Sequence, residues 1–96
     1  MKRYILTSRA ESDLQGIWDY TDENWGREQA QDYLRDIQAA IEKVASNPKL
    51  GKSCEDVRPG YLRYPVGSHV LFYGIAGDHI TIIRILHQRM DFARHF

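Results

Sequence analysis

Two stretches of the chain carry apolar residues at the three- and four-residue spacing of an amphipathic helix. These residues are Ala10, Leu14, Ile17, Trp18 and Trp25 in the first stretch, and Ala30, Tyr33, Leu34, Ile37, Ile41, Val44 and Ala45 in the second. Ser8 and Glu11 form a capping box, which predicts that the first helix begins at Ser8. Gly26 interrupts the pattern, and the proline after Asn47 disfavours further helix. The pattern therefore predicts an antiparallel helical hairpin with its turn near Gly26.

The remaining apolar runs have the length and composition of strands. They cover residues 4–7 before the helices and residues 61–65, 69–75 and 78–86 after them, with turns at 66–68 and 76–78. Residues 49–60 predict a loop of about a dozen residues. The last run is apolar on both faces, so we expect it to be central and covered by helices on one side. The order strand, two helices, three strands predicts an α+β fold with the helical hairpin on a small antiparallel sheet.

Length and composition exclude several classes of protein. A chain of 96 residues predicts one domain over residues 1–96. Its 13 basic and 13 acidic residues give zero net charge, which argues against nonspecific nucleic-acid binding. No apolar run approaches the ~20 residues of a membrane span, and no histidine or cysteine spacing suits a metal, so we expect no membrane, metal or cofactor. The single cysteine, Cys54, cannot form an internal disulfide, so we expect a cytoplasmic protein.

The end of the last predicted strand holds the densest group of polar side chains. His87 titrates near neutral pH and could act as a general acid or base, while Arg84 could hold a phosphate. If Arg63 lies beside Arg84, the resulting basic groove would suit a metal-free ribonuclease that activates a 2′-hydroxyl. The alternative is structural: His87 would bond a loop carbonyl, and the arginines would pair with Asp56 and Asp91. The residue types alone leave both interpretations open.

Several short sequence words follow one another along the chain. They are residues 8–14, residues 17–20 (Ile-Trp-Asp-Tyr), Trp25-Gly26, Asn47-Pro48 with Gly51, residues 57–61, residues 68–73 and residues 82–91. This ordered set runs from Lys2 to about Arg94 and resembles ParE-type toxins of bacterial type II toxin–antitoxin modules, within the RelE/ParE superfamily. Each word is weak alone, but their order is specific.

The resemblance implies a RelE/ParE-like toxin that inhibits DNA gyrase and is not itself an enzyme. It also implies that a ParD-type ribbon-helix-helix antitoxin neutralises the chain by direct binding, and that operator DNA is contacted only through that antitoxin. The RelE branch instead cleaves messenger RNA on the ribosome, and this stays the alternative function, with Arg63, Arg84 and His87 as candidate catalytic residues. Zero net charge and the lack of lysine in residues 53–96 weigh against it.

The contact residues are predicted from side-chain character and position. For gyrase we expect the C-terminal tail, residues 87–96, to make the contacts, because it combines basic and apolar side chains at an end expected to be free. The predicted residues are Arg84, His87, Arg89, Met90, Arg94 and Phe96. Removing residues 91–96 should then abolish toxicity and leave antitoxin binding largely intact. For the antitoxin we expect the helical residues Trp18, Tyr33 and Ile37.

Overall fold

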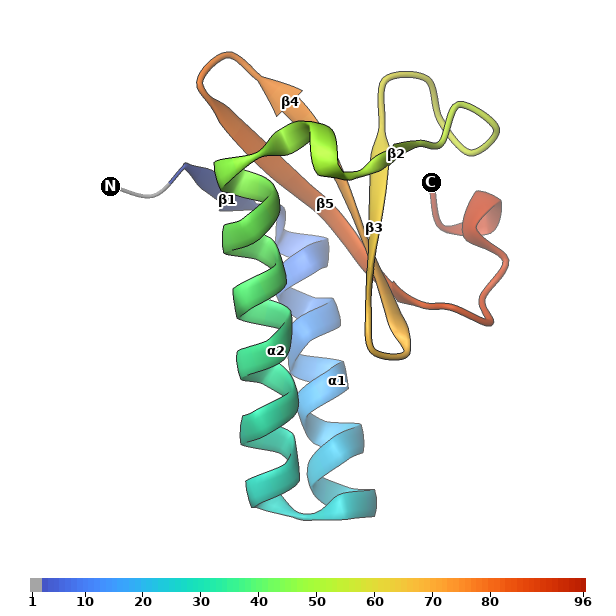
Figure 1. Ribbon diagram of the computed structural model, residues 1–96. Helices are drawn as coiled ribbons and strands as arrows, with labels where there is room; N and C mark the ends of the chain where they lie inside the picture. The colour runs from blue at the N-terminus through green and yellow to red at the C-terminus, as the bar shows by residue number, and fades with distance from the viewer. Residues whose placement is uncertain (1–2) are drawn as a thin grey trace.

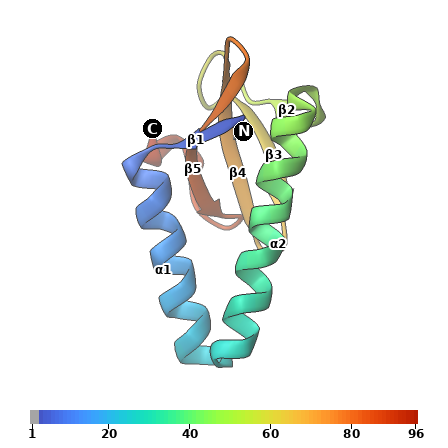
Figure 2. The ribbon, with the colours of Figure 1, turned by 90° about the vertical axis from the view of Figure 1, so that its left-hand side faces the viewer.

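The computed structural model describes residues 3–96, so the first two residues of the predicted domain lie outside it. In chain order the elements are β1 (Tyr4–Leu6), α1 (Ser8–Trp25), α2 (Arg27–Ser46), the 3₁₀ helix η1 (Pro48–Leu50), β2 (Lys52–Ser53), β3 (Leu62–Val66), β4 (His69–Ala76), β5 (His79–His87) and the 3₁₀ helix η2 (Phe92–His95). Figures 1 and 2 show α1 and α2 as a hairpin beside one face of the sheet. The predicted α+β architecture is confirmed.

The start of α1 is fixed by the side chain of Thr7. The Thr7 hydroxyl accepts a hydrogen bond from the backbone N–H of Ala10 at 3.0 Å and donates one to the carbonyl of Ile83 at 2.7 Å. The cap is therefore Thr7, and the predicted capping box at Ser8 is wrong by one residue, because the strand contact positions the threonine. At the other end, Gly26 adopts a positive φ of 95°, which glycine tolerates best, and joins the two helices as predicted.

The five strands lie in the order β1-β5-β4-β3-β2. All neighbouring pairs are antiparallel except β1 and β5, which pair in parallel with Tyr4 opposite Ile80. The sheet is mixed, so the prediction of an antiparallel sheet is wrong for its first strand. A three-residue strand carries no pattern that reveals its direction. The predicted loop over residues 49–60 also includes β2 and the last two residues of η1.

Each face of the sheet carries its own apolar cluster. The helical face is covered by α1 and α2. Ile37 and Ile41 of α2 are completely buried there, in one cluster with Tyr73 and Ile82 of the sheet. The opposite face carries a smaller cluster around Phe72, against which η2 packs. Because β5 lies between β1 and β4 and contributes to both clusters, the predicted central, two-sided apolar strand is confirmed.

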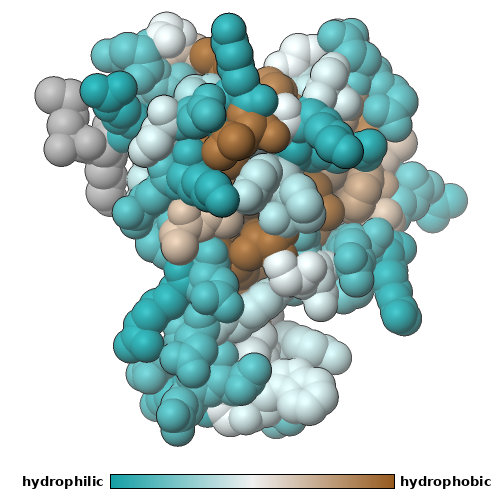
Figure 3. Space-filling model, viewed as in Figure 1, coloured by the Kyte–Doolittle hydropathy of each residue, from teal (hydrophilic) through white to brown (hydrophobic). Residues whose placement is uncertain are grey.

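The helical hairpin is longer than the sheet that it covers. In Figures 1 and 2 the turn between α1 and α2 projects well beyond the edge of the strands. On the face shown in Figure 3, hydrophobic surface gathers over the sheet, while the projecting end is hydrophilic or intermediate. Among residues 3–96, neither helix is apolar enough over its length to cross a membrane. The projecting hairpin and the sheet together create the concave surface described next.

Candidate partner-binding groove

A groove of about 850 Å³ lies between the projecting helical hairpin and the end of the sheet where β4 begins and β5 ends. Its lining includes three large apolar side chains that are strongly exposed: Tyr20 at 64%, Trp25 at 70% and Met90 at 45%. Folded monomers seldom leave such side chains together in a concavity, and Trp and Tyr are the residues that most often anchor protein interfaces. The groove therefore has the character of a binding site for a macromolecule.

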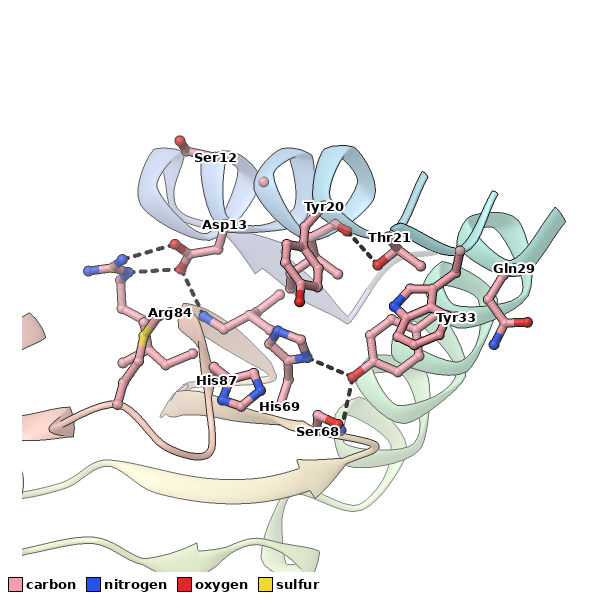
Figure 4. A pocket seen from close by; sticks show the side chains of 16 residues that line it. Ser12, Asp13, Tyr20, Thr21, Gln29, Tyr33, Ser68, His69, Arg84 and His87 are labelled. Atoms are coloured by element: carbon pink, nitrogen blue, oxygen red, sulfur yellow. Dashed lines mark hydrogen bonds and ion pairs between the residues drawn. The ribbon is translucent and has the colours of Figure 1, made fainter. Parts of the chain in front are cut away.

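One end of the groove is closed by an ion pair between α1 and β5. The carboxylate of Asp13 accepts hydrogen bonds from Arg84 Nε at 2.8 Å and Arg84 Nη2 at 2.9 Å, and from the backbone N–H of Ile85 at 2.9 Å (Figure 4). The hydrogen bonds that Arg84 donates to Asp13 raise the pKa of its guanidinium above the usual value. Both side chains are about 15% exposed or less, so this pair joins helix to sheet and leaves Arg84 little freedom for other contacts.

The opposite wall carries a tyrosine and two histidines from three different elements. Tyr33 Oη on α2 lies 2.6 Å from His69 Nδ1 on β4 and accepts the backbone N–H of Ser68 at 3.0 Å. The imidazole of His87, the last residue of β5, lies beside that of His69, with ring centroids 5.3 Å apart (Figure 4). Burial, and then the neighbouring His87, lower the pKa of His69, so this imidazole is neutral near neutral pH. The wall thus offers polar groups without a fixed charge.

The C-terminal tail is docked on the sheet. Phe92 and Phe96 make edge-to-face contacts with Phe72 at 4.9 and 5.1 Å between ring centroids, and Phe96 also meets Tyr61. The carbonyl of His95 accepts a hydrogen bond from Arg84 at 3.2 Å. The expectation of a free chain end is therefore wrong for this segment, because its aromatic side chains complete the cluster behind the sheet.

The predicted contact and catalytic residues are not brought together in one place. Arg63 lies opposite Phe72, which lies opposite Arg84, so a buried phenylalanine separates the two arginines and no shared basic groove forms. The alternative pairing of Arg84 with Asp56 or Asp91 is also wrong, since Arg84 pairs with a residue of α1. Arg94 does lie 3.5 Å from Asp91, in an exposed pair.

The three helical residues predicted to meet the antitoxin lie in three different environments. Tyr33 lines the groove. Trp18 is half-buried and is not part of the lining. Ile37 is completely buried in the core and offers no surface to a partner. Cys54 is also completely buried, and burial raises the pKa of its thiol.

Two groups of the groove were missed by sequence reasoning. Asp13 lies three residues after Ala10 and four before Ile17, so it falls on the apolar stripe of α1. An acid on such a stripe is a signal that a buried cation must face it, and this signal was available. The contact between Tyr33 and His69 had no such signal, because it depends on how the β3–β4 turn meets α2.

Comparison with known proteins assigns the chain to a family. Residues 4–92 match the family described as ParE toxin of type II toxin-antitoxin system, parDE. The chain is 47% identical over 94 residues to Toxin ParE1 of Mycobacterium tuberculosis, covering 97% of this chain and 96% of that protein. It is 48% identical over 95 residues to Toxin ParE1 of Caulobacter vibrioides, covering 99% and 98%.

A solved structure shares the fold. It is described as a chromosomal ParDE TA system from P. aeruginosa and superposes with a TM-score of 0.78, covering 91% of this chain and 96% of that chain. At 22% sequence identity this match bears on the fold alone. The family match over most of the chain and the two curated relatives establish the family: the chain belongs to the ParE toxin family of type II toxin–antitoxin systems.

Proposed function

We propose that this chain inhibits DNA gyrase and is neutralised by a ParD-type antitoxin that docks in the groove between the helical hairpin and the sheet. Its membership of the ParE toxin family is the observation that carries the proposal. The exposed aromatic side chains Tyr20 and Trp25 support the docking site, since a helical segment inserts its apolar side chains into such a groove. Operator DNA would be contacted only through the antitoxin.

The gyrase-contacting surface is proposed on the exposed part of the C-terminal segment. Of the residues predicted there, Arg89, Met90 and Arg94 are exposed. Arg84 and Phe96 are instead engaged within the chain, by the ion pair with Asp13 and by the aromatic cluster, and we leave them out of this surface. Met90 also lines the groove, together with the predicted contact His87. An antitoxin bound in the groove would therefore cover part of the gyrase-contacting surface, so neutralisation would be direct competition.

The ribonuclease alternative receives less support from the geometry. General acid–base catalysis needs its groups within hydrogen-bond reach of one reacting atom. Here Arg84 is bonded to Asp13, and Phe72 lies between Arg84 and Arg63. Only Arg84 and His87 of the three candidate catalytic residues line the groove. We therefore favour inhibition by binding over catalysis.

The decisive experiment incubates the purified chain with purified gyrase, ATP and relaxed plasmid. We expect supercoiling to be inhibited and linear plasmid to accumulate after the gyrase is denatured and digested. Met90→Asp should raise the concentration needed for inhibition at least about tenfold, the effect of losing roughly 1.4 kcal/mol of contact energy. Lys43→Asp, at an exposed position near the far end of α2, is the matched control and should leave inhibition unchanged.

A second assay separates the two functional classes. In a cell-free translation reaction the chain should leave messenger RNA intact. Cleavage of messenger RNA on ribosomes, with gyrase unaffected at the same concentration, would refute the proposal in favour of the ribonuclease. Adding the ParD-type antitoxin encoded with this chain should restore supercoiling. If the two proteins bind one another while gyrase stays inhibited, neutralisation by competition is wrong.

A further inference from the structure

The two histidines of the groove wall form a pair whose geometry is set by the sheet. His69 begins β4 and His87 ends β5, and the two residues lie opposite each other in the strand register. Their rings meet edge to face, with an interplanar angle of 82°. Figure 4 shows both imidazoles on the same side of the groove, below α1. Both rings belong to the lining of the groove.

The hydrogen bonds of the two rings fix where each neutral imidazole carries its proton. The Tyr33 hydroxyl has one proton and two acceptors within reach, His69 Nδ1 at 2.6 Å and the Val66 carbonyl at 3.4 Å. The much shorter distance to His69 favours donation by the phenol hydroxyl to Nδ1. Nδ1 of His69 is then an acceptor, and its proton resides on Nε2. Nδ1 of His87 accepts the backbone N–H of Arg89 at 3.1 Å, so His87 also carries its proton on Nε2.

Both Nε2–H groups lack an acceptor within residues 3–96. Every buried side-chain nitrogen or oxygen in that range has a hydrogen-bond partner, so the two Nε2 atoms are accessible to solvent. The titratable and charged groups around the pair are Asp13 and Tyr20 on α1, Tyr33 on α2 and Arg84 on β5. The carboxylate of Asp13 is already engaged by Arg84 and Ile85. The groove thus holds two N–H donors and no free carboxylate to receive them.

We propose that His69 and His87 form a receptor for one carboxylate, an Asp or Glu side chain of the antitoxin segment that occupies the groove. The inference rests on the proposed function and adds the chemistry by which the partner is recognised. A carboxylate suits the site because it has two oxygens and only accepts hydrogen bonds, so it can take both N–H groups at once. Such bonds gain strength when one partner is charged, and more so beside apolar walls such as Tyr20 and Trp25.

The site also predicts that binding is coupled to protonation. In the free chain, burial and the neighbouring imidazole lower the pKa of His69. A bound carboxylate favours the charged imidazole and raises that pKa, so a proton is taken up on binding. Affinity for the antitoxin should therefore increase as the pH falls from about 8 to about 6. Burial raises the pKa of Tyr33, so this phenol stays neutral in this range, and Asp13 is paired with Arg84.

The first test examines the free chain. Long-range nitrogen-15 NMR spectra of the histidine rings distinguish a proton on Nδ1 from one on Nε2. We expect the Nε2–H form at both His69 and His87 at pH 8. A proton on Nδ1 of either ring overturns the inference, because that ring would then present an acceptor. This readout does not involve the antitoxin.

The second test measures binding of the ParD-type antitoxin encoded with this chain. His87→Phe keeps an aromatic ring but removes the donor, and should weaken binding about 10- to 100-fold, the effect of losing a hydrogen bond to a charged group. His87→Gln keeps an N–H and should recover most of the affinity. His79→Gln, at the other end of β5, is the matched control. Thermal melts of each variant show whether the chain still folds.

A double-mutant cycle then identifies the acceptor. Each Asp and Glu of the antitoxin is changed in turn to Asn or Gln, and one of these changes should remove the effect of His87→Phe and the pH dependence together. If the wild-type chain binds no antitoxin, the proposed function itself fails. If it binds, and His87→Phe binds equally well at both pH values, only the carboxylate receptor is refuted.

Discussion

Replacing Asp13 by Asn should strongly destabilise the fold, because Asp13 is the ion-pair partner of Arg84. The substitution removes the negative charge that accepts two hydrogen bonds from Arg84, while the guanidinium stays about 15% exposed and without a counter-ion. Removing one partner of a buried ion pair costs about 3–5 kcal/mol. The residual exposure places this pair near the lower limit, so we expect a loss of about 3 kcal/mol.

A loss of this size is large for a small domain. At about 0.05–0.15 kcal/mol per residue, a chain of 96 residues has a free energy of unfolding of about 5–14 kcal/mol. A loss of about 3 kcal/mol lowers the melting temperature by about 12–24 °C for a domain of this size. Urea unfolding monitored by circular dichroism measures the free energy directly, and Asp19→Asn is the matched control, since Asp19 is exposed on the same helix.

The cause can be tested separately from the magnitude. Arg84→Gln and the double variant complete a cycle in which the two changes together should cost at least about 1 kcal/mol less than their sum. If Asp13→Asn costs no more than Asp19→Asn, or if the two changes are additive, the ion pair does not join helix to sheet as argued. Residual structure in the unfolded chain cannot mimic the coupling, because the two residues are 71 positions apart.

Three further predictions follow from contacts elsewhere in the fold. Tyr73→Phe removes the hydroxyl that donates to the Pro48 carbonyl and accepts the Gly51 N–H, so we expect the free energy of unfolding in urea to fall by about 1–3 kcal/mol. Gly51→Ala should destabilise the fold at least as much, since the new Cβ would overlap the Tyr73 ring. Unchanged stability in either variant would contradict the anchoring role of Tyr73. Phe96→Ala should lower stability by about 1–2 kcal/mol, because the tail packs on the sheet; unchanged stability would restore the view of a free end. Because burial lowers the pKa of His69, the unfolded chain takes up a proton at a higher pH than the folded chain, and stability should fall as the pH drops below about 6.5. His69→Gln should make stability depend less on pH in this range. An equal slope in both proteins would assign the pH dependence to other groups.

The structure also changes what the tail deletion should do. Removing residues 91–96 takes away Phe92 and Phe96 and uncovers Phe72, so loss of toxicity in that variant would not identify a contact with gyrase. Substitutions at exposed positions such as Arg89 and Met90 leave the aromatic cluster intact. They are the better test of the gyrase-contacting surface.

Elements with a strong repeating pattern were predictable from the sequence, and contacts across the chain were not. The stripe that includes Ile37 and Ile41 predicts α2 directly, and the run around Ile82, apolar on both faces, predicts β5, because burial of one or both faces dictates these patterns. The direction of β1 could not be predicted, because its three residues are too few to form a pattern. The prediction of a free tail rests on its place at the chain end, and its few aromatic residues show no period that would indicate packing on the sheet.

In the candidate site, single residues could be selected from the sequence, whereas their contacts could not. His87 could be selected from residue type alone, and Asp13 could have been, since it interrupts an apolar stripe. The partner of each could not, because Tyr33 and His69 lie 36 residues apart and Asp13 and Arg84 lie 71 apart. Their contacts depend on the way the hairpin lies against the sheet. Propensity describes single residues and short windows, whereas a groove is a property of packed layers.

The parallel pairing of β1 with β5 has a consequence for synthesis of the chain. Tyr4 meets Ile80, and Thr7 bonds the carbonyls of Ile82 and Ile83, so the first strand has no partner until the last one has been translated. Contacts between such distant residues form slowly, because a long loop must close before they stabilise anything. A ribosome that stops before β5 releases a chain that lacks the strand between β1 and β4. Premature termination before β5 would therefore yield fragments without a folded groove, and the sheet would be complete only after β5 has left the ribosome.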